Sequence, residues 1–383
     1  MTETVTKKSL IDYFSALDDP RQAWKVEYPL PEIMLVVLCA TLAGAESFVE
    51  IARWGRMKLG FLRQLLPFAR GIPSHDALND VINGLDAEVF SQCFATWVES
   101  LRDADPEIVA IDGKTSRRAH GRDGPALHTV SAWAARQRLV LGQQATAEKS
   151  NEITAIPLLL ERLQLAGALV TIDAHSGLTW GCQSAIAEAV IAKQADYLLA
   201  LKANQLSLSG EVELFFTDPT RCPDKPHETV EADHGRIETR RHFVSHDVDW
   251  LSSDRRFPGE PRFPGLKAIA MVEATVEDKA SGAATTAKRY YISSLAFDPA
   301  FFAKAVRAHW GVENRLHWVL DVVFHDDLMR LRTANGPKNM ATVKHMALNL
   351  INSAPGNDSL RVKRKAAGWD DTFLLAIVRG QTQ

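Results

Sequence analysis

The sequence predicts an α/β protein: an all-helical N-terminal domain, then a layer of strands and helices that carries a mostly β insertion. Three observations support this prediction. Residues 1–103 hold apolar residues at helical spacing. From residue 108 onward, short apolar runs typical of buried strands alternate with helical segments. Between about 206 and 296, strand-like pieces are separated by loops rich in proline and glycine.

The composition is that of an ordinary globular protein of 383 residues, 46% hydrophobic and 24% charged, long enough for two or three domains. A net charge of −3 excludes a uniformly basic protein that coats DNA, so any contact with nucleic acid must come from local basic patches. Taken singly, each patch is more often a solvated surface than a binding site. Three patches occur: Lys114, Arg117, Arg118, His120 and Arg122; Arg236, Arg240 and Arg241; and Arg361, Lys363, Arg364 and Lys365.

Cysteine usage and the N-terminal sequence indicate a cellular compartment. The four cysteines lack C-x-x-C spacing, which suggests neither a disulfide framework nor a zinc site. The apolar run 33–45 has 13 residues and is too short to span a bilayer. The start, MTETVTKKSLIDYF, lacks the apolar core of a signal peptide. We therefore expect a cytoplasmic protein with no membrane partner.

The N-terminal domain, residues 1–103, is expected to be a bundle of short helices. Ser74 and Asp86 stand where N-caps are expected, just before two apolar-periodic segments. Such a bundle fits either a DNA-reading module or a packing domain. The expected helices cover residues 32–43, 48–66, 75–83 and 89–101.

The next domain, residues 104–353, is expected to hold the α/β layer. Its elements are, in chain order, strands at 108–111, 128–135 and 138–147, a helix at about 151–167, a strand at 168–172, a helix at 183–194 and a strand at 197–201. This is the order of a ribonuclease-H-like layer, in which the first and fourth strands end side by side. Asp112 follows the first of these strands and Asp173 follows the fourth.

The insertion at about 206–296 separates this layer from a long helix. Asp298 is expected to cap that helix and Pro299 to lie in its first turn, and the helix is expected to continue to about Arg330. A tail, 354–383, is expected to hold the third basic patch. The remaining expected elements are strands at 228–232, 238–244, 267–275 and 286–293, and helices at 337–352 and 371–378.

Three acidic residues carry the candidate chemistry. Glu313 lies beside the apolar stripe of the long helix, with His309 and His317 one turn before and after it. Alone, Asp112 fits a turn, Asp173 fits a helix cap and Glu313 fits a solvated surface. Brought together at one edge of the sheet, three carboxylates would repel one another unless a cation lay between them. Such oxygen ligands suit Mg²⁺ or Mn²⁺, and two ions would support in-line attack on a phosphodiester.

Nine strings carry a family resemblance: AIDGKTSRR, EKSNEITAIPLLL, VTIDA, CQSAIA, ADYLLALKANQ, HGRIETRR, YYISSL, RAHWGVENRLHWVLDVVF and MALNLI. In sequence, order and spacing they resemble the DDE transposases of bacterial insertion sequences, in the ISAs-type branch that includes the H-repeat-associated proteins. The resemblance covers about residues 12–352. The N-terminal part resembles the helical domain that accompanies the catalytic domain in this branch.

This resemblance implies that Asp112, Asp173 and Glu313 are the catalytic, metal-binding triad of a ribonuclease-H-like domain. The implied activity is cleavage of double-stranded DNA at terminal inverted repeats, dependent on Mg²⁺ or Mn²⁺ with two ions, followed by strand transfer into target DNA. It also implies a homodimer on DNA, associated with the bacterial nucleoid. The DNA contacts expected from the resemblance and the basic patches are Lys114, Arg117, Arg118, Lys202, Asn204, Gln205, Arg236, His309 and Arg315.

Two features depart from the family pattern. In the broader superfamily the glutamate lies in a Tyr-x₂-Arg-x₃-Glu-x₆-Lys signature, whereas Val306, His309 and Leu320 stand at the other positions here. The string HSGLTWG, residues 175–181, intervenes after Asp173, where it would displace the aspartate or reshape the DNA channel. Three residues are candidates for the missing positive charge: Arg307, Arg315 and Arg332.

Two alternatives stay open. One is a DNA-binding protein of the same fold that has lost its activity or acquired another role. The other is a different ribonuclease-H-like nuclease, such as a junction resolvase. Metal-dependent cleavage would distinguish an active transposase from the inactive DNA-binding protein. A preference for inverted-repeat ends would exclude the other nuclease. Trp310 and Trp318 are expected to pack beneath the long helix rather than to stack on flipped bases.

Overall fold

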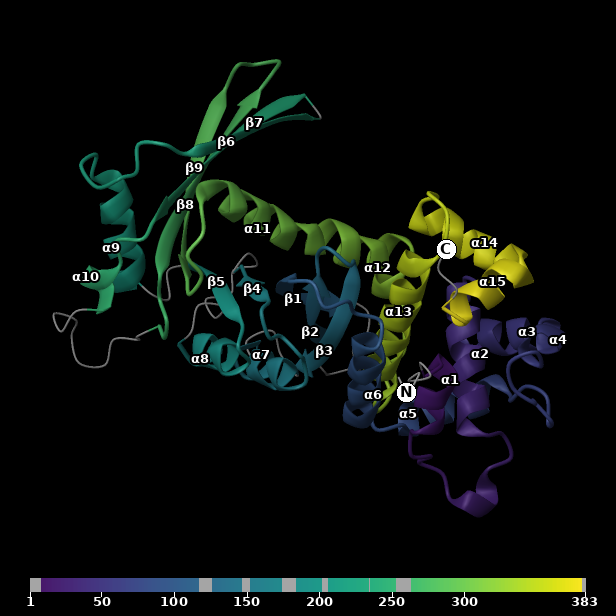
Figure 1. Ribbon diagram of the computed structural model, residues 1–383. Coiled ribbons are helices and arrows are strands. Elements are labelled where there is room, and N and C mark those ends of the chain that lie inside the picture. The colour runs from purple at the N-terminus through teal and green to yellow at the C-terminus, as the bar shows by residue number, and fades with distance from the viewer. Residues whose placement is uncertain are drawn as a thin grey trace, which may run out of the picture. The chain divides into compact units, whose positions relative to one another are not determined.

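A computed structural model describes residues 8–116, 126–146, 152–173, 184–201, 206–233, 235–252 and 263–380 (Figure 1). The chain forms two compact units, each assembled from separate stretches. The helical unit comprises Met1–Ala104, Gly113–Glu148 and Glu313–Gln383, and the sheet unit comprises Asp105–Asp112 and Lys149–Val312. Within the described ranges, no helix is long and apolar enough to cross a membrane.

The sheet unit is built on a mixed sheet in the order β1-β4-β5-β9-β8-β7-β6. β1, β4 and β5 run parallel, and every later pairing is antiparallel. The strands are β1 (Ile108–Ser116, of which the first half belongs to this unit), β4 (Leu169–Ile172), β5 (Asp196–Leu201), β6 (His227–Asp233), β7 (Arg236–Ser245), β8 (Ala268–Asp278) and β9 (Ala284–Ser293). The predicted strands at 168–172 and 197–201 and the four strands predicted in the insertion are therefore confirmed.

Helices cover both faces of this sheet. Leu198 and Ala200 share one apolar cluster with Phe302 of helix α11, and the strand alternation turns Leu199 to the opposite face. Figure 1 shows α11 along one face and α7 and α8 on the other. The helices of this unit are α7 (Glu152–Glu161), α8 (Ser184–Ala192), α9 (Leu206–Thr217), α10 (Asp249–Ser252) and α11 (Pro299–Val312).

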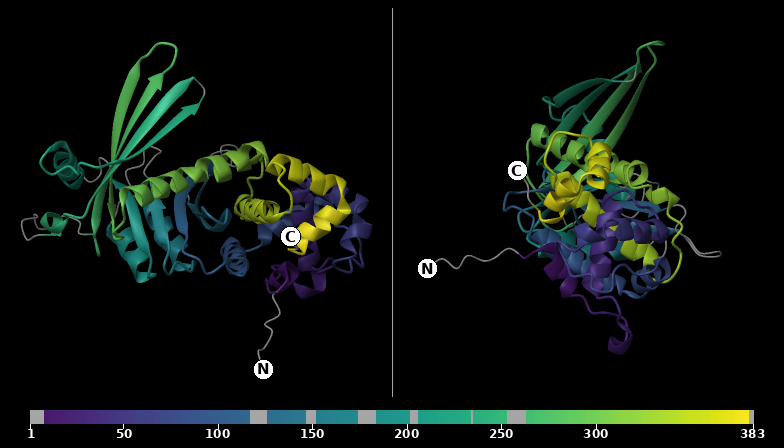
Figure 2. Two further views of the ribbon diagram at one scale, coloured as in Figure 1. Left: turned by 45° about the horizontal axis from the view of Figure 1, so that its top comes forward. Right: turned by 90° about the vertical axis from the view of Figure 1, so that its right-hand side faces the viewer.

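The predicted insertion is an extension of the central sheet. β9 pairs with β5 through Leu198↔Ser293, so β6 to β9 continue the same sheet. The last four residues of β9 are buried, whereas its first six are exposed, and Figure 2 shows these strands running beyond the helices. Helix α9 was not predicted, although Leu208, Val212 and Phe215 recur at helical spacing and are buried.

The helical unit is centred on α13 (Gly336–Ser353), which is buried along most of its length. It packs against α2, α5, α6 and β3. The predicted N-caps are confirmed: the Ser74 hydroxyl and the Asp86 carboxylate accept hydrogen bonds from the first turns of α5 and α6. The surrounding elements are α1 (Leu10–Ser15), α2 (Leu30–Leu42), α3 (Phe48–Met57), α4 (Leu59–Leu62), α5 (His75–Gly84), α6 (Ala87–Glu99), β2 (Leu127–Ala134), β3 (Leu139–Thr146), α14 (Leu360–Trp369) and α15 (Asp371–Val378).

The third basic patch is partly internal, which corrects the expectation of a basic tail. It lies on helix α14, where Lys363 and Arg364 are buried. The Lys363 ammonium donates to the Ala354 carbonyl at 2.5 Å, and Arg364 donates to the Thr41 carbonyl at 3.1 Å. These side chains cap carbonyl groups inside the unit, so the patch offers less surface charge than its sequence suggests.

The long helix begins as predicted and ends earlier. The Asp298 carboxylate accepts from the Phe301 N–H at 2.7 Å, and Pro299 opens α11. After Val312 the chain continues as a π-helical turn, Glu313–His317, and then as α12 (Trp318–Val322). The helix stops eight residues short of the predicted end at Arg330 because His325 takes a left-handed conformation, with φ at 50°.

Candidate active site

The two predicted aspartates follow matched positions on neighbouring parallel strands of the sheet unit. The last aligned pair of β1 and β4 is Ile111↔Ile172, so Asp112 and Asp173 are the next residues on their strands. Adjacent strands lie about 4.8 Å apart. The alignment predicted for these two carboxylates is therefore present.

One detail of that prediction is wrong. β1 does not end at Asp112 but continues to Ser116. The strand continues because its second half, Gly113 to Ser116, belongs to the helical unit, where it lies beside β2. Asp112 thus marks the end of the parallel pairing with β4, not the end of the strand.

Asp173 has a cationic neighbour that the sequence did not predict. An Arg289 Nη1 lies 3.7 Å from an Asp173 oxygen, and the guanidinium lies over the Trp310 ring, 4.7 Å from its centroid. The Asp173 side chain is 7% exposed and that of Arg289 43% exposed. Burial, together with the charge of Asp173, raises the pKa of the neighbouring Tyr291. The only sequence signal was that Arg289 directly precedes the string YYISSL.

His309 is placed differently from the prediction. It is buried, and its Nδ1 lies 2.9 Å from the Thr171 hydroxyl on β4. This contact anchors α11 to the sheet. Because the ring faces the sheet, this conformation leaves His309 little exposed surface for DNA.

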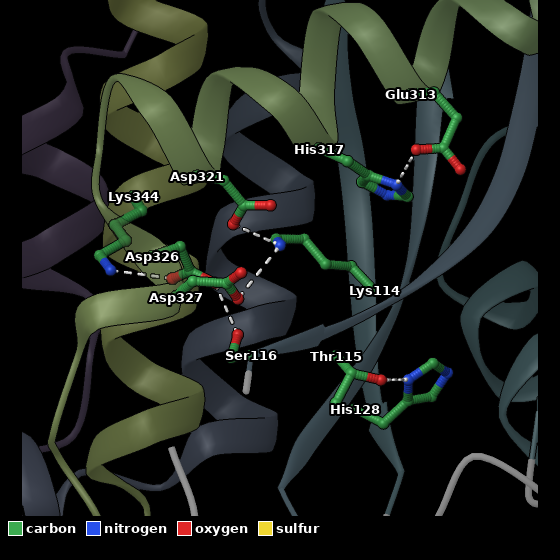
Figure 3. Close-up of polar contacts among 10 residues, drawn as sticks. All are labelled: Lys114, Thr115, Ser116, His128, Glu313, His317, Asp321, Asp326, Asp327 and Lys344. Carbon is green, nitrogen blue, oxygen red and sulfur yellow. Dashed lines mark hydrogen bonds and ion pairs between the residues drawn. The ribbon is translucent and has the colours of Figure 1, made fainter. Parts of the chain in front are cut away.

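Glu313 lies at the start of the π-helical turn in the helical unit. Its carboxylate is 3.5 Å from Nδ1 of His317, one turn further along (Figure 3). The Glu313 side chain is about half exposed, whereas the His317 ring is buried. π-Helical turns inside α-helices frequently mark functional positions. Glu313 is therefore held at the margin of a buried face, as predicted, with an imidazole behind it.

Most basic residues expected to contact DNA have carboxylate partners or fall outside the described residues. The Lys114 ammonium donates to Asp321 at 2.5 Å. Arg240 pairs with Glu231 at 3.1 Å on the neighbouring strand. Arg236 and Arg315 are exposed. The predicted residues outside the described ranges are Arg117, Arg118, His120, Arg122, Lys202, Asn204 and Gln205, together with the string at 175–181.

Each unit therefore presents side chains of the kind that hold divalent cations. The sheet unit offers the carboxylates of Asp112 and Asp173, and the helical unit offers the Glu313 carboxylate and the His317 imidazole. Carboxylate oxygens suit Mg²⁺ and Mn²⁺, and an imidazole is more compatible with Mn²⁺ than with Mg²⁺. The chemistry of these donors fits phosphodiester cleavage.

Comparison with known proteins agrees with this chemistry. The family model described as "Transposase DDE domain" matches residues 103–350, and the model described as "DDE_Tnp_1-associated" matches residues 11–98. The "H repeat-associated putative transposase YhhI" of Escherichia coli K12 is 37% identical over 385 residues, covering 97% of this chain and 98% of the relative. The "Putative transposase YncI" of Escherichia coli O157:H7 is 38% identical over 380 residues, covering 97% and 94%.

A solved structure, the piggyBac transposase synaptic complex with hairpin DNA, aligns with 97% of this chain and 79% of its own at 10% identity. The TM-score of this alignment is 0.43. The chain belongs to the DDE transposases of insertion sequences, with the ribonuclease-H-like fold of that family and relatives among the H repeat-associated proteins.

Proposed function

We propose that this transposase cleaves double-stranded DNA at the terminal inverted repeats of its element and joins the cut strand to target DNA, in a reaction that depends on Mg²⁺ or Mn²⁺. The observation that carries the proposal is the register of β1 and β4, which aligns Asp112 with Asp173. Two carboxylates on neighbouring rigid strands repel each other, and a cation bound by both would relieve that repulsion.

Asp112, Asp173 and Glu313 would hold the metal, because carboxylate oxygens are ligands that suit Mg²⁺ and Mn²⁺. Within the helical unit, the His317 imidazole beside Glu313 offers a further donor atom. When bound, two divalent ions polarise the scissile phosphate and stabilise the leaving oxygen. The protein's own contribution is to fix these ligands on a sheet and a helix rather than on loops.

Several cationic or polar side chains are proposed to hold the DNA backbone near these carboxylates. Arg289 is the strongest of them, because its partly exposed guanidinium already lies beside Asp173. Phosphate contacts of this kind position DNA and carry little sequence information. The remaining proposed contacts are Arg117, Arg118, Lys202, Asn204, Gln205, Arg236 and Arg315. Joining two repeat ends requires at least two active sites, so we propose a homodimer on DNA.

The test is a nicking assay on DNA that carries the terminal repeats flanking the gene, with and without Mg²⁺. Wild type should nick at the repeat boundary only with the metal. Asp112→Ala and Glu313→Gln should lower nicking at least about 100-fold, the loss typical of removing one group that stabilises transition-state charge, while DNA binding stays nearly unchanged. Glu188→Gln, an exposed glutamate on α8, is the matched control and should nick like wild type.

Two outcomes would count against the proposal. Mg²⁺-dependent nicking by Asp112→Ala would show that the triad is assigned to the wrong residues. Binding of the repeats by wild type without any nicking would favour the non-catalytic alternative.

A further inference from the structure

Lys114, two residues after Asp112, joins β1 to the helix that carries Glu313. Its ammonium donates to an Asp321 oxygen at 2.5 Å and lies 3.8 Å from an oxygen of Asp327 (Figure 3). Asp321 lies eight residues after Glu313, on α12. The Lys114 side chain is only 11% exposed. The positive charge of a lysine enclosed in this way is balanced by the neighbouring carboxylates. Such a lysine therefore attracts a DNA phosphate only weakly.

A second connection runs parallel to the first. The Ser116 hydroxyl donates to one Asp326 oxygen at 2.6 Å, and the Lys344 ammonium donates to the other at 2.8 Å. Asp326 and Lys344 are both buried. Burial raises the pKa of Asp326, but Lys344 and Ser116 more than offset it and hold the pKa below its usual value. Asp326 is therefore ionised and fixed from both sides.

The backbone is shaped to deliver Asp326 to this position. His325, the residue before it, has φ at 50°, a left-handed conformation that costs free energy for a residue other than glycine. Asp326 then opens a short 3₁₀ turn, Asp326–Leu328. Strain of this kind persists only where surrounding contacts determine the conformation, and here they are the bonds from Ser116 and Lys344.

We propose that Lys114, Asp321 and Asp326 are positioning residues, which fix the helix carrying Glu313 against the strand segment that follows Asp112. This inference rests on the proposed function, because it assigns these residues to the geometry of the same carboxylates. Buried ion pairs stabilise folds poorly compared with apolar packing of equal volume. Short, directional hydrogen bonds to both oxygens of a carboxylate instead fix the position of that carboxylate. A metal ligand in an active site is held most precisely when the residues that support it are themselves rigid.

The experiment compares Lys114→Met and Asp321→Asn with wild type in nicking, DNA affinity at several salt concentrations, and thermal unfolding. Both variants should stay folded at the assay temperature and bind repeat DNA with an unchanged salt slope, while the nicking rate falls about 10- to 100-fold. Lys114→Arg keeps the charge and should recover part of that loss. Lys58→Met is the matched control, since Lys58 pairs with Asp371 at 2.7 Å on α15, and it should nick like wild type.

Three results would overturn the positioning role. A salt slope lowered by about one in Lys114→Met would make Lys114 a phosphate contact. Nicking by Asp321→Asn at the Lys58→Met rate would show that the connection serves stability only, and this variant decides the question if Lys114→Met fails to fold. Absence of nicking by wild type is a distinct result, which overturns the proposed function and the positioning role with it.

Discussion

Asp326 of the helical unit and Asp173 of the sheet unit are both nearly buried carboxylates, yet their surroundings differ. Asp326 accepts two short hydrogen bonds, from Ser116 and from the buried Lys344. Among the described residues, the guanidinium of Arg289 lies 3.7 Å from an Asp173 oxygen, beyond ordinary hydrogen-bond length. The Lys344 side chain is 8% exposed and that of Arg289 is 43% exposed.

This contrast separates a structural carboxylate from one that can take a ligand. Both oxygens of Asp326 accept hydrogen bonds from protein donors, so binding a cation there would require breaking these hydrogen bonds. The guanidinium of Arg289 beside Asp173 is partly exposed, so it is accessible to a phosphate. We therefore expect substitutions at Asp326 to act through the stability and position of the surrounding helices, and substitutions near Asp173 to act directly on DNA chemistry.

The largest expected effect is that of Asp326→Ala. Removing the carboxylate leaves the Lys344 ammonium buried without its partner, which should lower the free energy of unfolding by about 3–5 kcal/mol. Urea denaturation measures this loss. Asp80→Ala, at an exposed position on α5, is the control and should change stability by less than about 0.5 kcal/mol. The double variant Asp326→Leu/Lys344→Met should lose less than Asp326→Ala; an equal or greater loss would refute the ion-pair explanation.

The second prediction concerns pH and the buried His345, next to Lys344 on α13. Burial lowers the pKa of His345 from 6.5 to about 3, so the folded state keeps the ring neutral while the unfolded chain takes up a proton below pH 6.5. The neutral His345 ring therefore adds nothing that is lost above pH 6.5, and the free energy of unfolding declines as the pH falls from 6.5 toward 3. Between pH 7 and pH 5 wild type should lose about 2 kcal/mol of unfolding free energy, at roughly 1.4 kcal/mol per pH unit.

Urea denaturation at several pH values tests this expectation. His345→Gln has no titrating ring and should show a flatter dependence over the same range. An equally steep decline in that variant would assign the pH sensitivity to other groups.

The sequence predicts features that depend on residues close together in the chain better than features that depend on residues far apart in it. The strand order, the cap at Asp298 and the alignment of Asp112 with Asp173 follow from local periodicity and from the regular geometry of parallel strands. Helix α9 also carried a local signal, in the spacing of its buried apolar residues, but the surrounding proline-rich loops favoured a β interpretation.

The side-chain partners were not predictable in the same way. Lys114 and Asp321 are 207 residues apart, and nothing near Lys114 distinguishes a lysine that meets a carboxylate from one that meets a phosphate. Arg289 reaches Asp173 only because β9 joins the central sheet beside β5. The extension of β1 past Asp112 likewise depends on its second neighbour, β2. These features arise from tertiary contacts that no local pattern records.

The third prediction tests the accessible side of the contrast. Arg289→Met should lower stability by less than about 1 kcal/mol, because a partly exposed ion pair contributes little. It should lower the nicking rate about tenfold, which at 1.4 kcal/mol per factor of ten is the size of one charged contact to DNA. Lys288→Met is the matched control, since Lys288 precedes Arg289 on β9, is similarly exposed and pairs with Glu273. Equal nicking by the two variants would remove Arg289 from the proposed DNA contacts.

The smallest expected effect concerns the two tryptophans of the long helix. Trp310 packs against the apolar cluster beneath α11, as predicted, but Trp318 is 56% exposed, so the expectation that it packs under the helix is wrong. Trp318→Ala should therefore change the free energy of unfolding by less than about 0.5 kcal/mol, whereas Trp310→Ala should lower it by more than about 1 kcal/mol. A large loss of stability in Trp318→Ala would contradict its exposure. Measuring repeat-DNA affinity on the same protein separates the remaining roles: a loss of about fivefold or more at unchanged stability would show that the exposed ring stacks on bases.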